Sequence, residues 1–189
     1  MIFPPHPTDF LHLLLREVIL TGETVIDATA GNGHDTIFLA HAVGPSGRVI
    51  AVDIQKEAVE STAARISKEQ LVDRVELHQM SHTSLHEVAT ESSVAAIVFN
   101  LGYLPGADRS VITASDTTVE ALTIATSLLK IGGILTVISY PGHTGGASEA
   151  KAVDAFFAKL VNFKIAKYEM VAAKTASPFL FAASRIALK

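Results

Sequence analysis

The sequence predicts a single α/β domain, residues 1–189, built on a mostly parallel β-sheet with helices on both faces. Short runs of branched apolar residues alternate with segments of helical periodicity, which is the pattern of parallel strands connected by helices. At 189 residues, of which 49% are hydrophobic, the chain has the size of one domain with a full core. No linker, low-complexity tract or internal repeat divides it.

Five apolar runs, each bounded by turn residues, are expected to form the parallel strands. They are rich in the β-branched residues that pack well on a pleated sheet. In chain order the runs are TVIDA (24–28), RVIAVD (48–53), RVELH (74–78), AAIVFN (95–100) and ILTVIS (134–139).

The segments between these runs carry helix signals. In residues 55–70, the apolar side chains fall on one face of a helix and the charged side chains fall on the face open to water. Thr117 and Glu120, three residues apart, form a capping-box pattern that predicts the start of a helix, and Gly132 with Gly133 predicts its end. A further helix is expected near residues 147–160.

The last two apolar runs, residues 162–172 and 178–188, are close enough to pair as an antiparallel hairpin at the sheet edge. Residues 1–22 are expected to form a helical segment that packs on the same domain. Five β/α units followed by a hairpin resemble the Rossmann-like class I methyltransferase fold, whose sheet ends with one reversed strand. This resemblance implies a seven-stranded, mostly parallel sheet.

Composition argues against several classes of protein. No apolar run approaches the roughly 20 residues that a membrane span needs, so no membrane partner is expected. The opening MIFPPHPTDF lacks the basic start and apolar core of a secretion signal. The chain has no cysteine, which excludes disulfides and zinc–thiolate sites and suits a reducing interior. We therefore expect a cytoplasmic protein.

Charge is distributed unevenly along the chain. The net charge of −4 argues against a protein that coats itself in nucleic acid. Residues 151–189, however, hold 7 Lys and Arg against 2 Asp and Glu. This basic end fits either a surface that contacts phosphates or lysines that protect a sheet edge.

The segment DATAGNGHDT, residues 27–36, follows the first predicted strand and predicts a small-molecule site that includes Thr29. Gly31 and Gly33 can adopt backbone angles closed to other residues and let a ligand approach the main chain. Thr36 stands where a dinucleotide fingerprint has its third glycine, and the carboxylate of Asp27 would repel a diphosphate but suits a cation. S-adenosylmethionine, which carries a sulfonium and an ammonium, is therefore the expected cofactor.

Asp53 ends the second predicted strand, where a carboxylate can accept hydrogen bonds from both ribose hydroxyls. The residues expected around the adenine are Ile54, Gln55, Met80, Ser81 and His82. The alternative interpretation needs no ligand: the glycines only make a strand-to-helix turn, and Asp53 caps the helix that follows.

The fourth predicted strand runs into NLGYLPG, residues 100–106. In class I methyltransferases this strand ends beside the reactive methyl, so the side-chain oxygen of Asn100 and the carbonyl of Leu101 could accept hydrogen bonds from an incoming amine. Such acceptors orient the lone pair of the amine, and positioning supplies much of the catalysis. Tyr103 could cover the methyl or stack on a base. The segment is similar to the NPPY motif of amino-directed methyltransferases, except at two central positions; a polar turn that caps the strand is the alternative.

Several segments together resemble one small bacterial family, the tRNA 5-aminomethyl-2-thiouridine methyltransferases (putative rRNA methylase family). The resemblance covers nearly the whole chain. Its segments are DATAGNGHDT, DIQ (53–55), SH (81–82), NLGYLPG, YPGH (140–143) with Gly145 and Gly146, and PFL (178–180). NLGYLPG and YPGHTGG are the specific ones, whereas many methyltransferases share the glycine loop.

The resemblance implies S-adenosylmethionine as methyl donor, the primary amine of the tRNA wobble uridine as acceptor, contact with the tRNA anticodon stem-loop, and a homodimer. The residues that would line the cofactor are Asp27, Gly31, Asn32, Gly33, Asp35, Thr36, Asp53, Gln55, Ser81, His82 and Asn100. Those that would face the nucleoside and anticodon loop are Tyr103, Asp108, Arg109, Tyr140, Gly142 and His143. His12 matches a family histidine near the amino end.

Catalytic roles are expected for Asn100, Tyr103 and His143. An aminomethyl group is largely protonated near neutral pH and must lose a proton, and His143 is a candidate acceptor. His143 could equally bond a phosphate or cap the following helix, and direct loss of the proton to water needs no residue.

The chain departs from the family pattern at two places. Ala107 and Arg109 stand where the family commonly has Gly and Lys, and Ala176 and Ser177 stand where Asn and Pro are usual.

No metal site is expected. His78, His82 and His86 recur every four residues, but His78 belongs to a predicted strand, so the three cannot share one helix face. Two other functions remain open: methylation of rRNA or of a small amine, and a non-catalytic module that binds S-adenosylmethionine or RNA.

Overall fold

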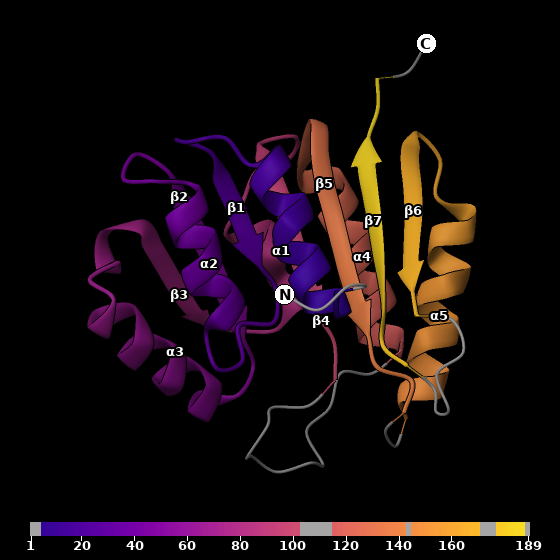
Figure 1. Cartoon of the computed structure of the whole chain (residues 1–189), viewed down its shortest axis with the longest axis horizontal. Coiled ribbons are helices and arrows are strands. Elements are labelled where there is room, and N and C mark those ends of the chain that lie inside the picture. The colour runs from indigo at the N-terminus through magenta and orange to yellow at the C-terminus, as the bar shows by residue number, and fades with distance from the viewer. Residues whose placement is uncertain (1–4, 103–114, 143–144, 171–176, 188–189) are drawn as a thin grey trace.

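A seven-stranded sheet forms the centre of the fold, and helices cover both of its faces (Figure 1). The computed structural model describes residues 5–102, 115–142, 145–170 and 177–187. The strands are β1 (Thr24–Asp27), β2 (Arg48–Asp53), β3 (Val75–Gln79), β4 (Val94–Asn100), β5 (Leu129–Ser139), β6 (Phe163–Glu169) and β7 (Phe179–Arg185). The strands expected from the sequence all form, and four of the first five match within about one residue.

The strand order is β3-β2-β1-β4-β5-β7-β6. The pairs among β1 to β5 are parallel, whereas β7 lies between β5 and β6 and runs antiparallel to both. This order confirms the predicted mostly parallel sheet with an antiparallel C-terminal hairpin. The carboxyl ends of β1, β2 and β4 meet at one edge of the sheet, so residues that follow these strands lie close together.

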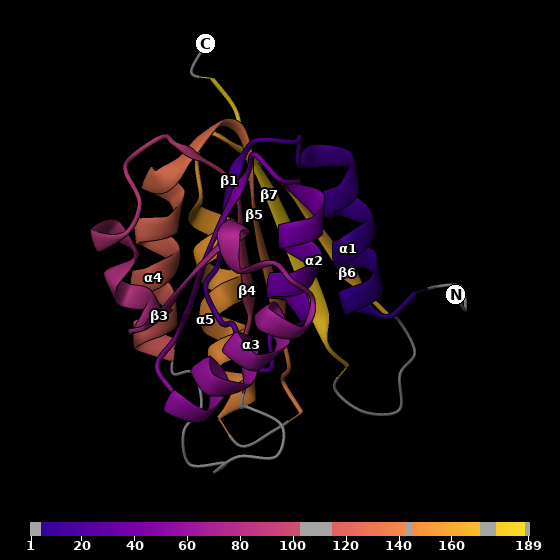
Figure 2. The same cartoon turned by 90° about the vertical axis from the view of Figure 1, so that its left-hand side faces the viewer.

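The helices form two layers. They are α1 (Pro7–Val18), α2 (His34–Ala42), α3 (Lys56–Lys68), α4 (Ser115–Leu128) and α5 (Gly146–Lys159), with short 3-10 segments η1 (Val72–Arg74) and η2 (His82–Glu87). Figure 2 shows α1 and α2 on one side of the sheet and α4 and α5 on the other. Buried residues of α3 join the layer of α1 and α2, and Leu85 of η2 joins the layer of α4 and α5.

Two hydrophobic cores lie on the two faces of the sheet. Neighbouring residues of one strand point to opposite faces, so Val25 of β1 belongs to the core with Leu11 of α1, while Ile26 belongs to the core with Leu122 of α4. All of these side chains are fully buried. Because both faces are covered, the parallel strands have continuous apolar runs rather than alternating ones.

Helix α1 packs across the sheet against β5 and β7. Pro7 occupies its first turn, and the side chain of His6 accepts a hydrogen bond from the backbone N–H of Thr8. Leu11 and Leu15, one turn apart, are buried against the sheet. Figure 1 shows α1 in front of the central strands, near the start of the chain.

The predicted boundaries of α4 were wrong at both ends. The helix begins at Ser115, so Thr117 lies inside the first turn and does not occupy the capping position. The helix ends at Leu128 and β5 begins at the next residue, so Gly132 and Gly133 lie within the strand.

These two glycines accommodate an irregularity in the pairing of β4 with β5. The register shifts between Val94 and Ala96, and Gly132 has a φ of +82°. A Cβ on Gly133 would lie 2.9 Å from the carbonyl oxygen of Lys130 and 3.0 Å from that of Val94. Glycine therefore permits a close backbone approach here.

Within the described ranges, no helix is both long and apolar enough to cross a bilayer.

Candidate active site

The loop between β1 and α2 is hydrogen-bonded to two neighbouring strands. The N–H of Ala28 donates to the carbonyl of Val98 in β4, and the N–H of Ala30 donates to the carbonyl of Val52 in β2. Gly31 and Gly33 have φ values of +53° and +77°. Gly33 caps α2 in a left-handed conformation, which glycine adopts without steric cost. The sequence-based argument for two permissive hinges agrees with this backbone.

Helix α3 holds the loop from one side. Thr62 donates its hydroxyl to the carbonyl of Gly31 at 3.0 Å, Ser61 donates to the side-chain oxygen of Asn32 at 3.1 Å, and the Nε of Arg65 donates to the carbonyl of Asn32 at 2.8 Å. A Cβ on Gly33 would lie 3.0 Å from the Oγ1 of Thr62.

The three α3 residues were not predicted as site residues. The sequence pattern predicts α3 as an amphipathic helix whose charged residues, Arg65 among them, face water, and it assigns no role to Ser61 or Thr62. Thr62 is in fact fully buried. The sequence signal that could have identified Thr62 is a threonine next to two small residues, Ala63 and Ala64, in the middle of the helix.

Asp27 lies beneath the loop rather than on its surface. Its side chain is fully buried, and its two oxygens accept hydrogen bonds from the N–H of Thr29 at 3.2 Å and from the hydroxyl of Thr36 at 2.6 Å. Burial and the nearby Asp35 carboxyl raise the pKa of Asp27 to about 7, although the two hydrogen bonds act in the opposite direction. Asp27 thus fixes the loop from within, and its contact with a cofactor stays a prediction.

Asp53 links the end of β2 to the loop. Its Oδ2 accepts from the N–H of Gly31 at 2.9 Å, and its Oδ1 accepts from the N–H of Gln55 at 2.9 Å. Each carboxylate oxygen can accept a second hydrogen bond. Ile54 is 61% exposed beside it. The ligand-free interpretation and the ribose assignment are therefore compatible, because Asp53 shapes the turn and keeps acceptor capacity.

The predicted adenine-side residues gather near Asp53. The N–H of Met80 donates to the carbonyl of Asp53 at 2.9 Å. Ser81 caps η2 by accepting from the N–H of Thr83 at 3.2 Å. Burial lowers the pKa of His82, and the negative charge of Asp53 opposes this shift, so His82 is close enough to sense that carboxylate.

Asn100, at the end of β4, is fixed by both its backbone and its side chain. Its N–H donates to the Oγ1 of Thr29 at 2.7 Å, which joins it to the glycine loop. Its Nδ2 donates to the Oδ2 of Asp35 at 3.1 Å. An ionised carboxylate only accepts hydrogen bonds, so the amide nitrogen must face Asp35.

Helix α1 reaches the same cluster. The Nε2 of His12 lies 2.7 Å from the Oδ1 of Asp35. Burial raises the pKa of Tyr140, and hydrogen bonds with Thr8 and Asn100 partly offset that rise. Tyr140 therefore stays a neutral phenol at neutral pH. The family resemblance points to His12, but its pairing with Asp35, 23 residues away, is not apparent from the sequence.

The remaining predicted residues divide into three groups. Tyr103, Asp108, Arg109 and His143 lie outside the described residues. Gly142 is exposed. Leu101 is 2% exposed as a whole residue, and the role of its carbonyl stays a prediction. The assignments of individual residues to cofactor or substrate stay predictions.

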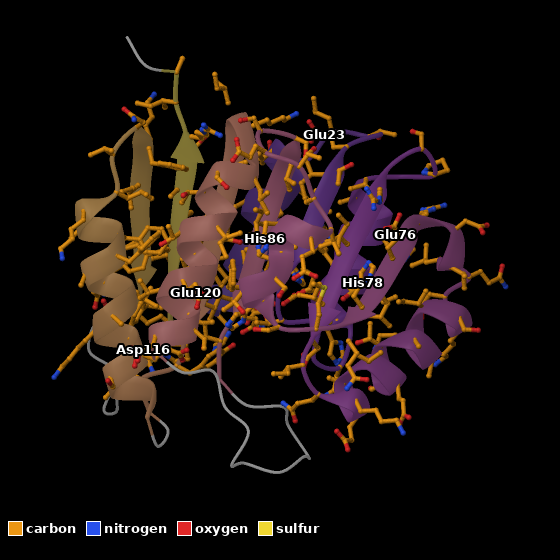
Figure 3. All side chains as sticks on the ribbon, turned by 180° about the vertical axis from the view of Figure 1, so that it is seen from behind. Glu23, Glu76, His78, His86, Asp116 and Glu120 are labelled. Carbon is orange, nitrogen blue, oxygen red and sulfur yellow. The ribbon has the colours of Figure 1, made fainter. Side chains whose placement is uncertain are left out.

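Across the described parts of the chain, no group of three His, Cys, Asp or Glu side chains could hold a metal ion. His78 lies on β3, whereas His82 and His86 belong to η2. Figure 3 shows His78 and His86 on these separate elements.

Two of the basic residues near the C-terminus serve the sheet itself. Lys167 lies 3.1 Å from Asp154 and 3.2 Å from Glu169, with its ammonium 4.0 Å from the centre of the Phe179 ring. Arg185 donates to the carbonyl of Leu129. These contacts favour a structural explanation for part of the basic end.

Comparisons with known proteins identify a family. The family model described as "Putative rRNA methylase" matches residues 49–184. The tRNA (mnm(5)s(2)U34)-methyltransferase of Arabidopsis thaliana chloroplasts is 43% identical over 160 residues, which cover 79% of this chain. The match spans 58% of the length of that relative.

Solved structures agree with this family over nearly the full chain. A protein of the rRNA-methylase description from Clostridium thermocellum has a TM-score of 0.94 at 35% identity, covering 98% of this chain and 100% of that one. A Streptococcus mutans protein in complex with SAH has a TM-score of 0.88 at 34% identity and the same coverage. The predicted class I methyltransferase fold is confirmed. The chain belongs to the family described as "Putative rRNA methylase".

Proposed function

We propose that this protein is an S-adenosylmethionine-dependent N-methyltransferase that acts on the aminomethyl group of the tRNA wobble uridine. It would convert 5-aminomethyl-2-thiouridine to 5-methylaminomethyl-2-thiouridine. One observation carries the proposal: the Nδ2 of Asn100 is held by Asp35, 3.1 Å away, at the end of the glycine loop. The amide oxygen of Asn100 is thereby directed away from Asp35 and can accept from an amine N–H. The chloroplast relative supplies the substrate class.

The residues of the loop fit S-adenosylmethionine. Asp53 retains acceptor capacity for ribose hydroxyls, and the exposed Ile54 offers an apolar surface for the adenine. The Asp27 carboxyl, with a pKa of about 7, can ionise when a cation binds nearby. The relative from Streptococcus mutans was solved with SAH. When bound, S-adenosylmethionine supplies a methyl group on a positively charged sulfur.

Asn100 would orient the acceptor. A neutral amine must present its lone pair in line with the bond that breaks, and an acceptor on one of its N–H groups fixes that direction. The backbone bond from Asn100 to Thr29 ties this acceptor to the loop that would hold the donor. The amine nitrogen gains the methyl as the carbon–sulfur bond breaks, and its surplus proton passes to water or to a base.

Several finer points belong to the same proposal. His143 as base, the substrate-facing residues, the tRNA anticodon stem-loop as partner, a homodimer and a cytoplasmic location all stay predictions. Sedimentation of the purified protein at micromolar concentration tests the dimer directly, and a monomer there would contradict it.

The reaction is tested with purified protein, S-adenosylmethionine and synthetic anticodon stem-loops that differ only in the aminomethyl group. Nucleoside mass spectrometry should show one added methyl on the stem-loop that carries the aminomethyl group and none on the stem-loop that lacks it. A methyl on ribosomal RNA or on a small amine instead would favour the second enzyme hypothesis. Bound S-adenosylmethionine without any S-adenosylhomocysteine product would favour a binding module.

Asn100→Ala provides the residue-level test. Loss of one hydrogen bond that strengthens as charge develops should lower kcat about 10- to 100-fold. The dissociation constant for S-adenosylmethionine should change by less than about threefold, because the backbone bond to Thr29 remains. Equal losses in turnover and affinity would show that Asn100 serves binding only.

A further inference from the structure

Helix α1 is held rigidly over the cluster around Asn100. Leu11 and Leu15 anchor its buried face. The Phe10 ring lies 4.3 Å from that of Tyr168, and the Tyr168 hydroxyl donates to the carbonyl of Pro5 at 2.7 Å. The helix therefore cannot shift without breaking contacts on both its buried face and its amino end.

His12 is fixed on this helix by two contacts. Its ring stacks on Phe38 of α2, with centroids 4.0 Å apart and an angle of 2° between the rings. Its Nε2 lies 2.7 Å from Asp35, and the two side chains are 28% and 9% exposed. Stacking on Phe38 fixes the plane of the imidazole, and in this plane the Nε2 is directed at the Asp35 carboxylate.

Asp35 connects His12 to Asn100. Its Oδ1 faces the Nε2 of His12, and its Oδ2 accepts from the Nδ2 of Asn100. Each oxygen of this nearly buried carboxylate thus has its own donor. Loss of either donor would leave a nearly buried carboxylate oxygen without a partner, which is costly.

We propose that His12 is a positioning residue for methyl transfer, acting through Asp35 on the amide of Asn100. This inference rests on the proposed function. By donating to Oδ1, His12 keeps Asp35 an acceptor that holds the amide nitrogen of Asn100. The amide oxygen then faces the incoming amine. Without this donor, the Asp35 side chain can turn, and the amide can rotate and present its NH₂ group where an acceptor is needed.

A second connection from the same helix supports this role. Thr8, one turn before His12, and Asn100 both act to lower the pKa of Tyr140, so both lie near its hydroxyl. Two residues of α1, Thr8 and His12, therefore lie near groups that surround Asn100. We infer that α1 is a part of the active site and not only a cover for the sheet.

The test compares three variants of the full-length protein. His12→Phe keeps an aromatic ring on Phe38 but removes the donor. His12→Gln places an amide nitrogen near the position of the Nε2 and restores the donor. Arg16→Leu is the matched control, because Arg16 lies one turn further on α1 with its guanidinium carbon 5.6 Å from the Phe38 ring centre.

His12→Phe should lower kcat about 10- to 100-fold, with KM for S-adenosylmethionine and the melting temperature close to those of Arg16→Leu. His12→Gln should recover most of the lost kcat. If His12→Gln does not recover turnover, the proposal is overturned. It is also overturned if the melting temperature of His12→Phe falls well below that of Arg16→Leu, because the lower kcat would then reflect lost packing.

A spectroscopic measurement separates this inference from the proposed reaction. The side-chain NH₂ signals of Asn100, identified by their absence in Asn100→Asp, are followed in ¹⁵N-labelled protein without RNA. They should move in His12→Phe, return in His12→Gln and stay in place in Arg16→Leu. Unmoved signals in His12→Phe would refute the positioning role whatever the RNA substrate is. Moved signals together with no methylation of the stem-loop would instead refute the proposed substrate.

Discussion

Replacement of Asp27 by Asn tests the most unusual group of the site, a carboxyl that is fully buried beneath the glycine loop. Asn has the same shape. Its oxygen can accept from the N–H of Thr29, and its NH₂ group can donate to the hydroxyl of Thr36, so both existing contacts have a counterpart. Asp27→Asn therefore differs from the unsubstituted protein mainly in lacking a carboxyl group that can ionise.

The expected effect follows from proton binding. The unfolded chain releases the Asp27 proton near pH 3.8, whereas the folded protein keeps it to about pH 7. Between these values the folded state holds more protons, so the free energy of unfolding falls as the pH rises, by about 1.4 kcal/mol per pH unit. The stabilising contribution is complete below the unfolded pKa and is lost as the pH passes the folded one. Over the whole interval the loss approaches about 4 kcal/mol.

Urea unfolding followed by circular dichroism, at pH values from about 5 to about 8, measures this difference. The stability of Asp27→Asn relative to the protein should increase with pH by about 3 kcal/mol across that range. Asp116→Asn, at an exposed position of α4 visible in Figure 3, is the matched control and should run parallel to the protein. Parallel curves for Asp27→Asn as well would refute the assignment of a raised pKa to this carboxyl.

Three further substitutions probe the loop, the ribose site and the basic end. Gly33→Ala should lower the free energy of unfolding by about 1–3 kcal/mol, because alanine at a φ of +77° is strained and its Cβ meets Thr62; an unchanged urea midpoint would contradict this. Asp53→Ala should weaken S-adenosylmethionine binding about 10- to 100-fold by calorimetry, and an unaltered dissociation constant would rule out the ribose role. Arg185→Met should cost about 1–3 kcal/mol of stability through its lost bond to Leu129 and leave RNA affinity unchanged; reduced RNA affinity at full stability would reverse that assignment.

The sheet was predictable because its signal is local. Parallel strands covered on both faces give short apolar runs, and Val49 to Val52 of β2 are all fully buried, as their sequence indicates. The start of β5 was missed for a related reason. Gly132 and Gly133 look like a helix stop, but the shift in register with β4 requires flexible backbone inside the strand. A bulge depends on the partner strand, which a local pattern does not contain.

The glycine loop and Asp53 were predictable from their order after β1 and β2, whereas the bonds that support them were not. Thr62 and Gly31 are 31 residues apart, and Asn100 and Asp35 are 65 apart. Such pairs depend on how α3 and β4 are placed beside the loop. The role of Asp27 shows the same limit, since the sequence supplies a carboxylate but not its full burial.

The position of β7 constrains how the protein can be made. Strand β6 pairs with β7, and β7 fills the space between β5 and β6. During synthesis, β6 leaves the ribosome before the strand that joins it to the sheet exists. Helix α5 can already pack on α4 and β5 at that stage, whereas β6 has no paired neighbour in the sheet until β7 has emerged and lies between it and β5.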